Sequence, residues 1–205
     1  MFMEVLVRRR FHLVTLGCPK NYVDSEGIDY ILGEAGYIAV ENPREADFLI
    51  VNTCGFIEAA REESLAVLRE LAREKRPHQL LIAAGCMAER HRGLLQEQVP
   101  ELDGMIDTRH WSQIPILLNL LRERKEKACP VVLPREGETS LVQSFVRRPF
   151  MGASAYLKIA DGCSAPCAFC SIPLIKGPQQ SKSRADILRE ARELTEQGIK
   201  EIILI

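Results

Sequence analysis

Three cysteines near the C-terminal end of the chain have a spacing that suits an iron–sulfur cluster. Cys163, Cys167 and Cys170 follow one another as C-x3-C-x2-C. Thiolates are preferred ligands of such clusters, and a cubane held by only three cysteines leaves one iron open to an outside ligand. Clusters that only carry electrons usually have protein ligands on every iron. The spacing therefore favours catalysis with S-adenosylmethionine, a cofactor of radical reactions.

A zinc knuckle or a redox pair is the alternative for the same three cysteines. Zinc sites usually have four ligands, commonly in two well-separated pairs. Neither a histidine nor a further cysteine follows Cys170 in the chain. The spacing therefore favours a cluster over zinc.

A second set of three cysteines lies in the first half of the chain. Cys18, Cys54 and Cys86 each follow, by a residue or two, an apolar run that we predict to be a strand. The carboxyl ends of parallel strands form the ligand crevice of open α/β sheets, so these loops can converge despite their separation in sequence. We expect a second three-cysteine site, with buried thiols as the alternative, since free cysteine behaves as a small hydrophobe.

Glycine stands beside each cysteine of this second set, at Gly17, Gly55 and Gly85. Glycine permits tight turns and a close approach of the backbone to a bulky ligand, which fits a site. Cys129, before Pro130, belongs to neither set and is predicted to be structural or incidental.

Short apolar runs alternate with longer amphipathic runs from residue 11 to about residue 128. The predicted strands are 11–16, 46–51, 80–84 and a short edge strand at 104–107, and the predicted helices are 24–34, 56–75, 88–96 and 111–127. We expect Asp24 or Ser25 to open the first helix. This alternation is typical of an α/β fold with a doubly wound parallel sheet.

The remainder of the chain divides into a linker and the beginning of a second domain. Residues 130–154 lose the periodicity and carry several prolines, which is typical of an interdomain linker. Residues 155–205 then predict a strand, a helix capped by Ser183 and ended by Gly198, and another strand, which together form one βαβ unit. We therefore expect domains at 1–129 and 155–205, with the second domain incomplete at the C-terminus because a single βαβ unit cannot bury both faces of its sheet.

Composition indicates an ordinary globular protein. Of the 205 residues, 46% are hydrophobic and 27% charged, with a net charge of −1, so charge gives no indication of direct nucleic-acid binding. The first basic residues follow a short apolar run, the reverse of a secretory signal, and no apolar stretch has the length of a membrane span. We expect a cytoplasmic protein without a membrane partner, in which the seven cysteines are metal ligands or buried thiols.

Taken together, the motifs resemble those of the radical-SAM methylthiotransferase family, over nearly the whole chain. They are Leu16-Gly-Cys-Pro-Lys-Asn21 with Asp24-Ser-Glu26, Asn52-Thr-Cys-Gly-Phe-Ile57, Gly85-Cys-Met-Ala-Glu-Arg90, and Tyr156-Leu-Lys-Ile-Ala-Asp-Gly-Cys163 with Cys170-Ser-Ile-Pro173. Pro19 and Lys20 resemble the branch that modifies a ribosomal protein. The branch that modifies tRNA more often has Gln and Met there.

The resemblance implies an enzyme with two 4Fe-4S clusters and S-adenosylmethionine. Cys163, Cys167 and Cys170 would hold the cluster that binds S-adenosylmethionine at its open iron, at the start of a partial TIM-like barrel. The second set of cysteines would hold an auxiliary cluster in the methylthiotransferase domain. The reaction would add a methylthio group to the β-carbon of an aspartate in ribosomal protein S12 of the small subunit, with electrons from an external donor.

Three further residues bear on this resemblance. Phe169 would pack near the adenine of S-adenosylmethionine, although a role as core filler is the alternative. Lys176 and Lys182 stand where the family commonly has arginine. A lysine cannot reproduce the bidentate contact of an arginine with an anion, so an anion contact at these positions is in doubt.

Two other functions remain open from the sequence. A tRNA methylthiotransferase would use the same chemistry on a modified adenosine and would differ only in its substrate. A non-enzymatic iron–sulfur or zinc module would contain zinc, or a fully ligated cluster that does not respond to S-adenosylmethionine. Iron and sulfide analysis with a spectroscopic titration separates this module from the enzymes.

Overall fold

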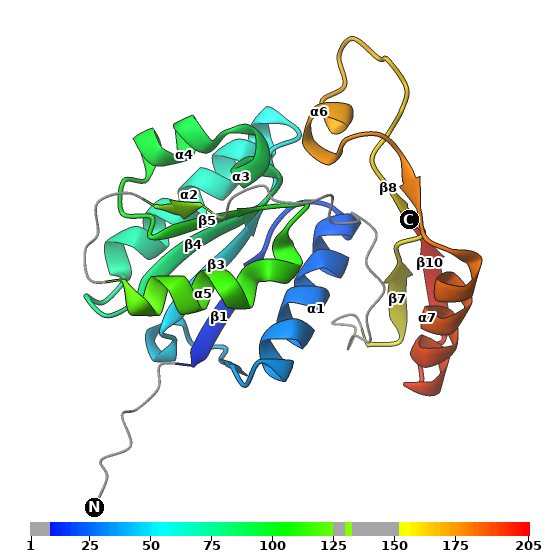
Figure 1. Ribbon diagram of the computed structural model, residues 1–205, viewed down its shortest axis with the longest axis horizontal. Helices are drawn as coiled ribbons and strands as arrows, with labels where there is room; N and C mark the ends of the chain where they lie inside the picture. The colour runs from blue at the N-terminus through cyan, green and yellow to red at the C-terminus, as the bar shows by residue number, and fades with distance from the viewer. Residues whose placement is uncertain (1–8, 125–129, 133–151) are drawn as a thin grey trace, which may run out of the picture.

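The computed structural model describes residues 9–124, 130–132 and 152–205, and its largest element is a six-stranded sheet (Figure 1). The strands are β1 (Arg10–Thr15), β2 (Ile38–Ala39), β3 (Phe48–Thr53), β4 (Leu80–Gly85), β5 (Gly104–Asp107) and β6 (Val131–Val132). They lie in the order β2-β1-β3-β4-β5-β6, and every neighbouring pair is parallel. The predicted parallel α/β sheet is confirmed.

Helices cover both faces of this sheet. They are α1 (Pro19–Glu34), α2 (Glu58–Glu74), α3 (Cys86–Arg90), α4 (Arg92–Gln98) and α5 (Ile114–Glu123), with the 3-10 turns η1 (Pro43–Glu45) and η2 (Trp111–Gln113). In β3, Phe48 and Ile50 join the core under α1 and α5, whereas Leu49 and Val51 join the core under α2, α3 and α4. Burial on both faces explains why the strands are continuous apolar runs in the sequence.

The order of the strands creates a switch point at the carboxyl edge of the sheet. The chain passes from β1 through α1 to β2 on one side of β1, and then returns to β3 on the other side. In open α/β sheets the ligand crevice lies where the direction of winding reverses, at the carboxyl ends of the strands. Cys18 and Cys54 follow the two strands that flank this point.

Helix α1 begins five residues earlier than the sequence predicts. Pro19 is its first residue and Cys18 is its N-cap, so neither Asp24 nor Ser25 opens the helix. Proline is favoured at the first helical position because its fixed φ suits the helix and its missing N–H would have no intrahelical partner there. The side chains of Asp24 and Ser25 are both buried within the helix and bind elsewhere.

Several other predicted boundaries differ from the structure. The helix predicted at 88–96 is two short helices, α3 and α4, separated at His91. Strand β5 is not an edge strand, because β6 pairs with it. Strand β6 also extends the first sheet past residue 129, into the segment predicted to be a linker. The rest of that linker, residues 133–151, and Cys129 lie outside the described residues.

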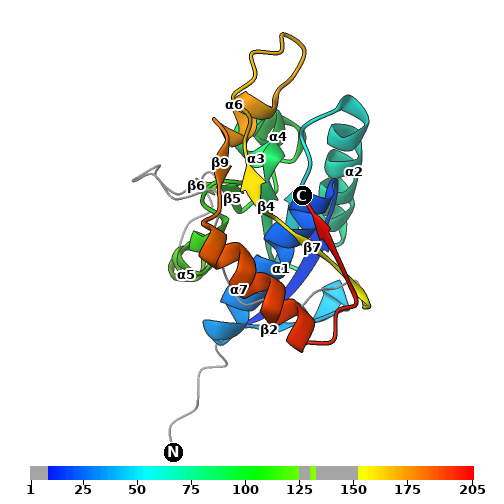
Figure 2. The same cartoon turned by 90° about the vertical axis from the view of Figure 1, so that its right-hand side faces the viewer.

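The C-terminal part lies beside α1 (Figures 1 and 2). It contains β7 (Ser154–Leu157), β8 (Ala160–Asp161), α6 (Ile172–Lys176), β9 (Gln180–Ser181), α7 (Arg184–Glu196) and β10 (Glu201–Leu204). Strand β10 pairs with β7 in parallel across α7, which confirms the predicted βαβ unit. Ser183 caps α7 by accepting a hydrogen bond from the N–H of Asp186, as predicted. Strands β8 and β9 add a small antiparallel pair that the sequence did not predict.

Among the described residues, no helix combines the length and the apolar composition needed to cross a bilayer.

Candidate metal centre

The three strand-end cysteines gather around the side chain of Asn21. The Oδ1 atom of Asn21 lies 4.0 Å from the Sγ of Cys18 and 3.8 Å from the Sγ of Cys86. Cys54 is close to the loop of Cys18, because a Cβ added at Gly17 would lie 2.5 Å from the Cβ of Cys54 and 2.9 Å from its Sγ. The structure therefore brings together the three loops that the sequence placed at the carboxyl ends of β1, β3 and β4.

Hydrogen bonds fix the orientation of the Asn21 carboxamide, which is only 1% exposed. Its Nδ2 atom donates to the carbonyl of Leu16 at 2.9 Å and to the carbonyl of Thr53 at 3.1 Å. Turning the amide over would place its oxygen against those two carbonyl oxygens. Oδ1 therefore faces the sulfurs, and Asn21 ties the loops after β1 and β3 to each other.

The glycines beside the cysteines allow these loops to approach one another closely. Gly17 and Gly85 have φ values of +92° and +90°, which side chains of L-residues rarely adopt. A Cβ at Gly85 would collide with Oδ1 of Asn52. The Nδ2 atom of the same side chain donates to the carbonyl of Asn21 in α1 at 3.0 Å. We predicted close approach to a ligand at these glycines. In the structure the close approach is between loops of the protein.

The thiols of this set differ in environment. Burial raises the pKa of Cys54 and raises the pKa of Cys86 to about 12, whereas the nearby ammonium of Lys176 lowers both values. Cys18 is exposed and caps the 16-residue helix α1, whose amino end favours negative charge. The ammonium of Lys176 and the amino end of α1 would thus favour the negatively charged thiolates that a bound metal requires.

The C-terminal set of cysteines lines one open hollow of about 640 Å³, which is within the size range of ligand pockets. Cys163, Cys167 and Cys170 all contribute to its wall, together with Pro173 and Leu174 of α6. The base of the loop is held by the N–H of Cys163, which donates to the carbonyl of Gly177 at 3.0 Å. Cys167 is exposed, and Cys163 and Cys170 are half-buried.

Phe169 is 93% exposed on this loop. The alternative that it fills the core is therefore wrong. Phe169 lies in the loop whose cysteines line the hollow, and the role predicted for it beside an adenine stays a prediction.

Neither set of cysteines forms a tight site for a single ion. Among the described residues, no group of three or more His, Cys, Asp or Glu side chains is arranged to hold one metal ion. The three thiolates of a cubane bind three different irons and therefore lie farther apart than the ligands of one ion. The donor types fit an iron–sulfur cluster, and we treat both sets as candidate sites for one.

A network of buried charges that the sequence did not predict lies between the two sets. We call Asp24, Lys158, Asp161 and Lys176 the four-charge network. Lys158 binds Asp24 and lies 3.4 Å from Asp161, and Lys176 lies 3.2 Å from each of the two carboxylates. Lys176 also donates to Oγ1 of Thr108, after β5, at 2.5 Å. The network joins α1 of the first sheet to β8 and α6 of the C-terminal part.

Attraction between opposite charges keeps Asp161 and Lys176 charged despite their burial. Burial alone would raise the pKa of Asp161, but Lys176 and Lys158 outweigh it and hold the pKa below its usual range. Burial alone would lower the pKa of Lys176, but Asp24, Cys86 and Asp161 outweigh it and hold the pKa above its usual range. Lys176 is thus engaged by carboxylates, which supports the doubt about an anion contact at this position.

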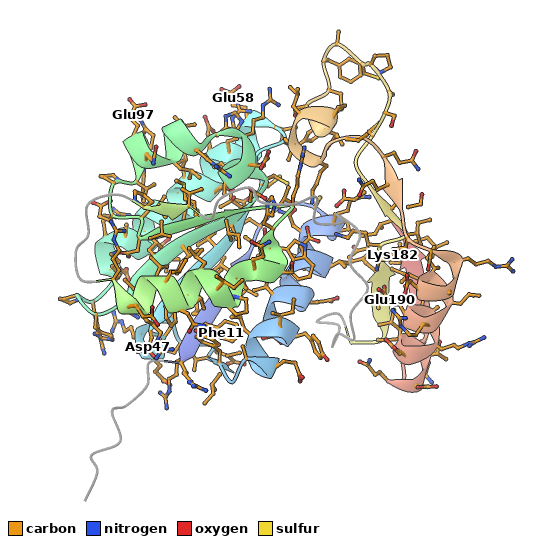
Figure 3. All side chains as sticks on the ribbon, in the orientation of Figure 1. Phe11, Asp47, Glu58, Glu97, Lys182 and Glu190 are labelled. Carbon is orange, nitrogen blue, oxygen red and sulfur yellow. The ribbon has the colours of Figure 1, made fainter. Side chains whose placement is uncertain are left out.

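The other lysine in doubt is also engaged. Lys182 donates to Glu190 of α7 at 2.5 Å, and both side chains are buried (Figure 3). Pro19 and Lys20, on which the resemblance to the ribosomal-protein branch rests, both have a place in the fold. Pro19 starts α1, and Lys20 donates to the carbonyl of Ala160 in β8 at 2.6 Å.

Fold and site define a class of protein: a parallel α/β domain with three cysteines at the carboxyl edge of its sheet, joined to a βαβ unit that carries three more. Residues 10–107 match the family model described as "Uncharacterized protein family UPF0004". Curated relatives named "Ribosomal protein uS12 methylthiotransferase RimO" align with almost the whole chain. The relative from Herpetosiphon aurantiacus is 45% identical over 96% of this chain and 47% of its own length. The relative from Roseiflexus sp. is 43% identical over 96% of this chain and 45% of its own length.

In sequence the chain is RimO-like, and it is similar to methylthiotransferases over almost its whole length. A more distant relative of the same name, from Thermoanaerobacter sp., is 42% identical over 94% of this chain and 44% of its own length. The chain thus spans less than half the length of the curated relatives it matches.

Proposed function

We propose that this chain is part of a cytoplasmic radical-SAM methylthiotransferase that modifies ribosomal protein uS12. The observation that carries the proposal is the gathering of six of the seven cysteines into two sets of three, one around Asn21 and one around an open hollow. The names of the relatives support the reaction and the substrate.

Each set would hold one 4Fe-4S cluster through three thiolates. The ligands would be Cys163, Cys167 and Cys170 in the C-terminal part, which would begin a partial TIM-like barrel, and Cys18, Cys54 and Cys86 at the sheet edge. When bound, the clusters would supply the electron that cleaves S-adenosylmethionine and the sulfur that is inserted.

The residues of this chain would prepare both sites for that chemistry. Asn21 orders the loops of the auxiliary site, and the ammonium of Lys176 offsets the negative charge of the thiolates at Cys54 and Cys86. The hollow beside Cys163 leaves room for S-adenosylmethionine, and Phe169 would stack on its adenine.

The substrate position would be the β-carbon of an aspartate in uS12, and electrons would come from an external donor protein. Lys20 supports the assignment to the ribosomal-protein branch only because it is part of the motif that resembles that branch. Its amino group is committed to β8, so we do not assign it a contact with the substrate.

Anaerobic reconstitution of the full-length protein tests the proposal. Replacing Cys163, Cys167 and Cys170 together by alanine should remove about half of the bound iron and abolish cleavage of S-adenosylmethionine, since a 4Fe-4S cluster requires these thiolates. The wild-type protein should add a methylthio group to uS12, as detected by mass spectrometry of the aspartate peptide. Unchanged iron in the triple variant, or zinc in place of iron, would contradict the cluster assignment. Modification of tRNA in place of uS12 would contradict the substrate.

A further inference from the structure

The four-charge network connects two helices that each begin beside a cysteine site. Cys18 and Asp24 belong to the same helix, since Cys18 caps α1 and Asp24 lies within it. Cys170 directly precedes Ser171, the N-cap of α6, and Lys176 is the last residue of that helix. The contact between Lys176 and Asp24, at 3.2 Å, therefore links two helices that each begin beside a cysteine site.

The network pairs opposite charges and is closed to solvent. Two lysines and two aspartates face one another, and their side chains are only 1–4% exposed. The ammonium of Lys20 adds a third positive charge, 3.9 Å from Asp161. Removing one member would leave an uncompensated charge in a buried position, which is strongly unfavourable. The two parts of the chain therefore cannot shift against each other without separating buried opposite charges.

Buried ion pairs are a poor way to gain stability, because apolar residues of similar volume often do as well or better. Such pairs specify one arrangement, since each carboxylate must meet its own ammonium groups. Asp24 meets Lys158 and Lys176 with its two different oxygens, so both the distance and the orientation between α1 and the C-terminal part are set.

We propose that Asp24, Lys158, Asp161 and Lys176 are positioning residues that hold the two cysteine sites at a fixed separation. This inference rests on the proposed function, and deepens it. The substrate carbon that would lose a hydrogen atom at one site must also lie within reach of the sulfur that the other site would supply, which requires the right separation. Loss of the network should therefore uncouple radical formation from product formation.

The variant Asp24→Asn in the full-length protein tests this, because it keeps the shape of the side chain and removes one negative charge. Both sites should retain their iron and S-adenosylmethionine should still be cleaved. The ratio of methylthiolated product to 5′-deoxyadenosine should fall by roughly 10- to 100-fold, since misplacement by about 1 Å can cost a reaction roughly 100-fold.

The matched control is Asp103→Asn. Asp103 is also a buried carboxylate and lies 2.6 Å from its partner Lys75, but it precedes β5 at the opposite edge of the sheet from the cysteines. This variant should lose stability to a similar degree and keep the wild-type ratio of product to 5′-deoxyadenosine. An equal fall of that ratio in both variants would show a purely structural role and overturn the inference.

Two measurements are independent of activity. In the metal-free protein, amide hydrogen exchange of residues 155–162 should be faster in Asp24→Asn than in wild type. In the loaded and reduced protein, the magnetic interaction between the two clusters in the EPR spectrum should change. If Asp24→Asn gives wild-type values in both measurements, the inference is overturned, whether or not the wild-type protein makes product. Absence of product from the wild-type protein would instead count against the proposed function. If Asp24→Asn does not fold, Lys158→Met is tested with the same measurements and decides in the same way.

Discussion

The Oδ1 atom of Asn21 lies 3.8 Å from the sulfur of Cys86, although the two residues are 65 positions apart in the sequence. The amide nitrogen of the same side chain is held by two backbone carbonyls, so its oxygen has no freedom to turn away. A single amide thereby connects the loops after β1 and β3 with the first residue of α3.

Replacing Asn21 should loosen the site formed by Cys18, Cys54 and Cys86 and leave the other cysteine site unchanged. Asn21→Asp removes both donors and sets an acceptor against the carbonyls of Leu16 and Thr53, so we expect the free energy of unfolding to fall by about 1–3 kcal/mol. Iron at this site should be lost faster to a chelator than iron at Cys163, Cys167 and Cys170. Asn119→Asp, at an exposed amide on α5, is the control and should change neither quantity. Equal loss of iron from both sites would argue against a local role of Asn21.

The thiols should differ in reactivity once metal is removed. At pH 8 a thiol with a pKa of about 12 is a thiolate in only about one molecule in ten thousand, so buried Cys86 should react slowly with iodoacetamide. Exposed Cys18 and Cys167 should react much faster. Mass spectrometry of the alkylated peptides measures this order, and reconstitution with iron and sulfide should protect all three residues. Reaction of Cys86 as fast as Cys18 would show that the loop after β4 is open.

Removing the strand-end cysteines should separate the two halves of the reaction. In the full-length protein, replacement of Cys18, Cys54 and Cys86 by alanine should preserve the cleavage of S-adenosylmethionine to 5′-deoxyadenosine and abolish methylthiolation. The expected loss follows from the absence of a sulfur-carrying site at the sheet edge, while the radical-forming site keeps its three ligands. Normal product from this variant would identify the three cysteines as buried structural thiols.

The two parts of the chain should differ in their ability to fold alone. A fragment of residues 1–132 should unfold cooperatively in urea, because its helices bury both faces of the sheet. It should be more stable than a fragment ending at residue 129, which lacks β6. The core cluster of residues 152–205 has only four buried residues, Ala155, Leu157, Leu194 and Ile199, so this fragment should not fold. A cooperative transition of that short fragment, measured by circular dichroism, would show that it is an independent domain.

Sequence patterns predicted the sheet well because burial on both faces leaves a local record. The run at 80–84 is apolar throughout and the run at 46–51 is apolar except for Asp47, and the structure places both at the centre of the sheet. The cysteines were predictable as a group for the same reason, since each comes just after such a run. The start of α1 was mispredicted because Asp24 has the residue type of a helix cap, while its carboxylate pairs with lysines that follow it in the sequence by 134 and 152 positions.

By itself, the sequence determined the parallel α/β architecture, the two sets of three cysteines and the family, because periodicity, spacing and motifs are local properties of the chain. Only the tertiary structure decided how the sites are held. The sequence does not indicate with which oppositely charged residue Lys158 or Asp161 will pair. Pairing depends on which side chains become buried together, and only the folded chain determines that.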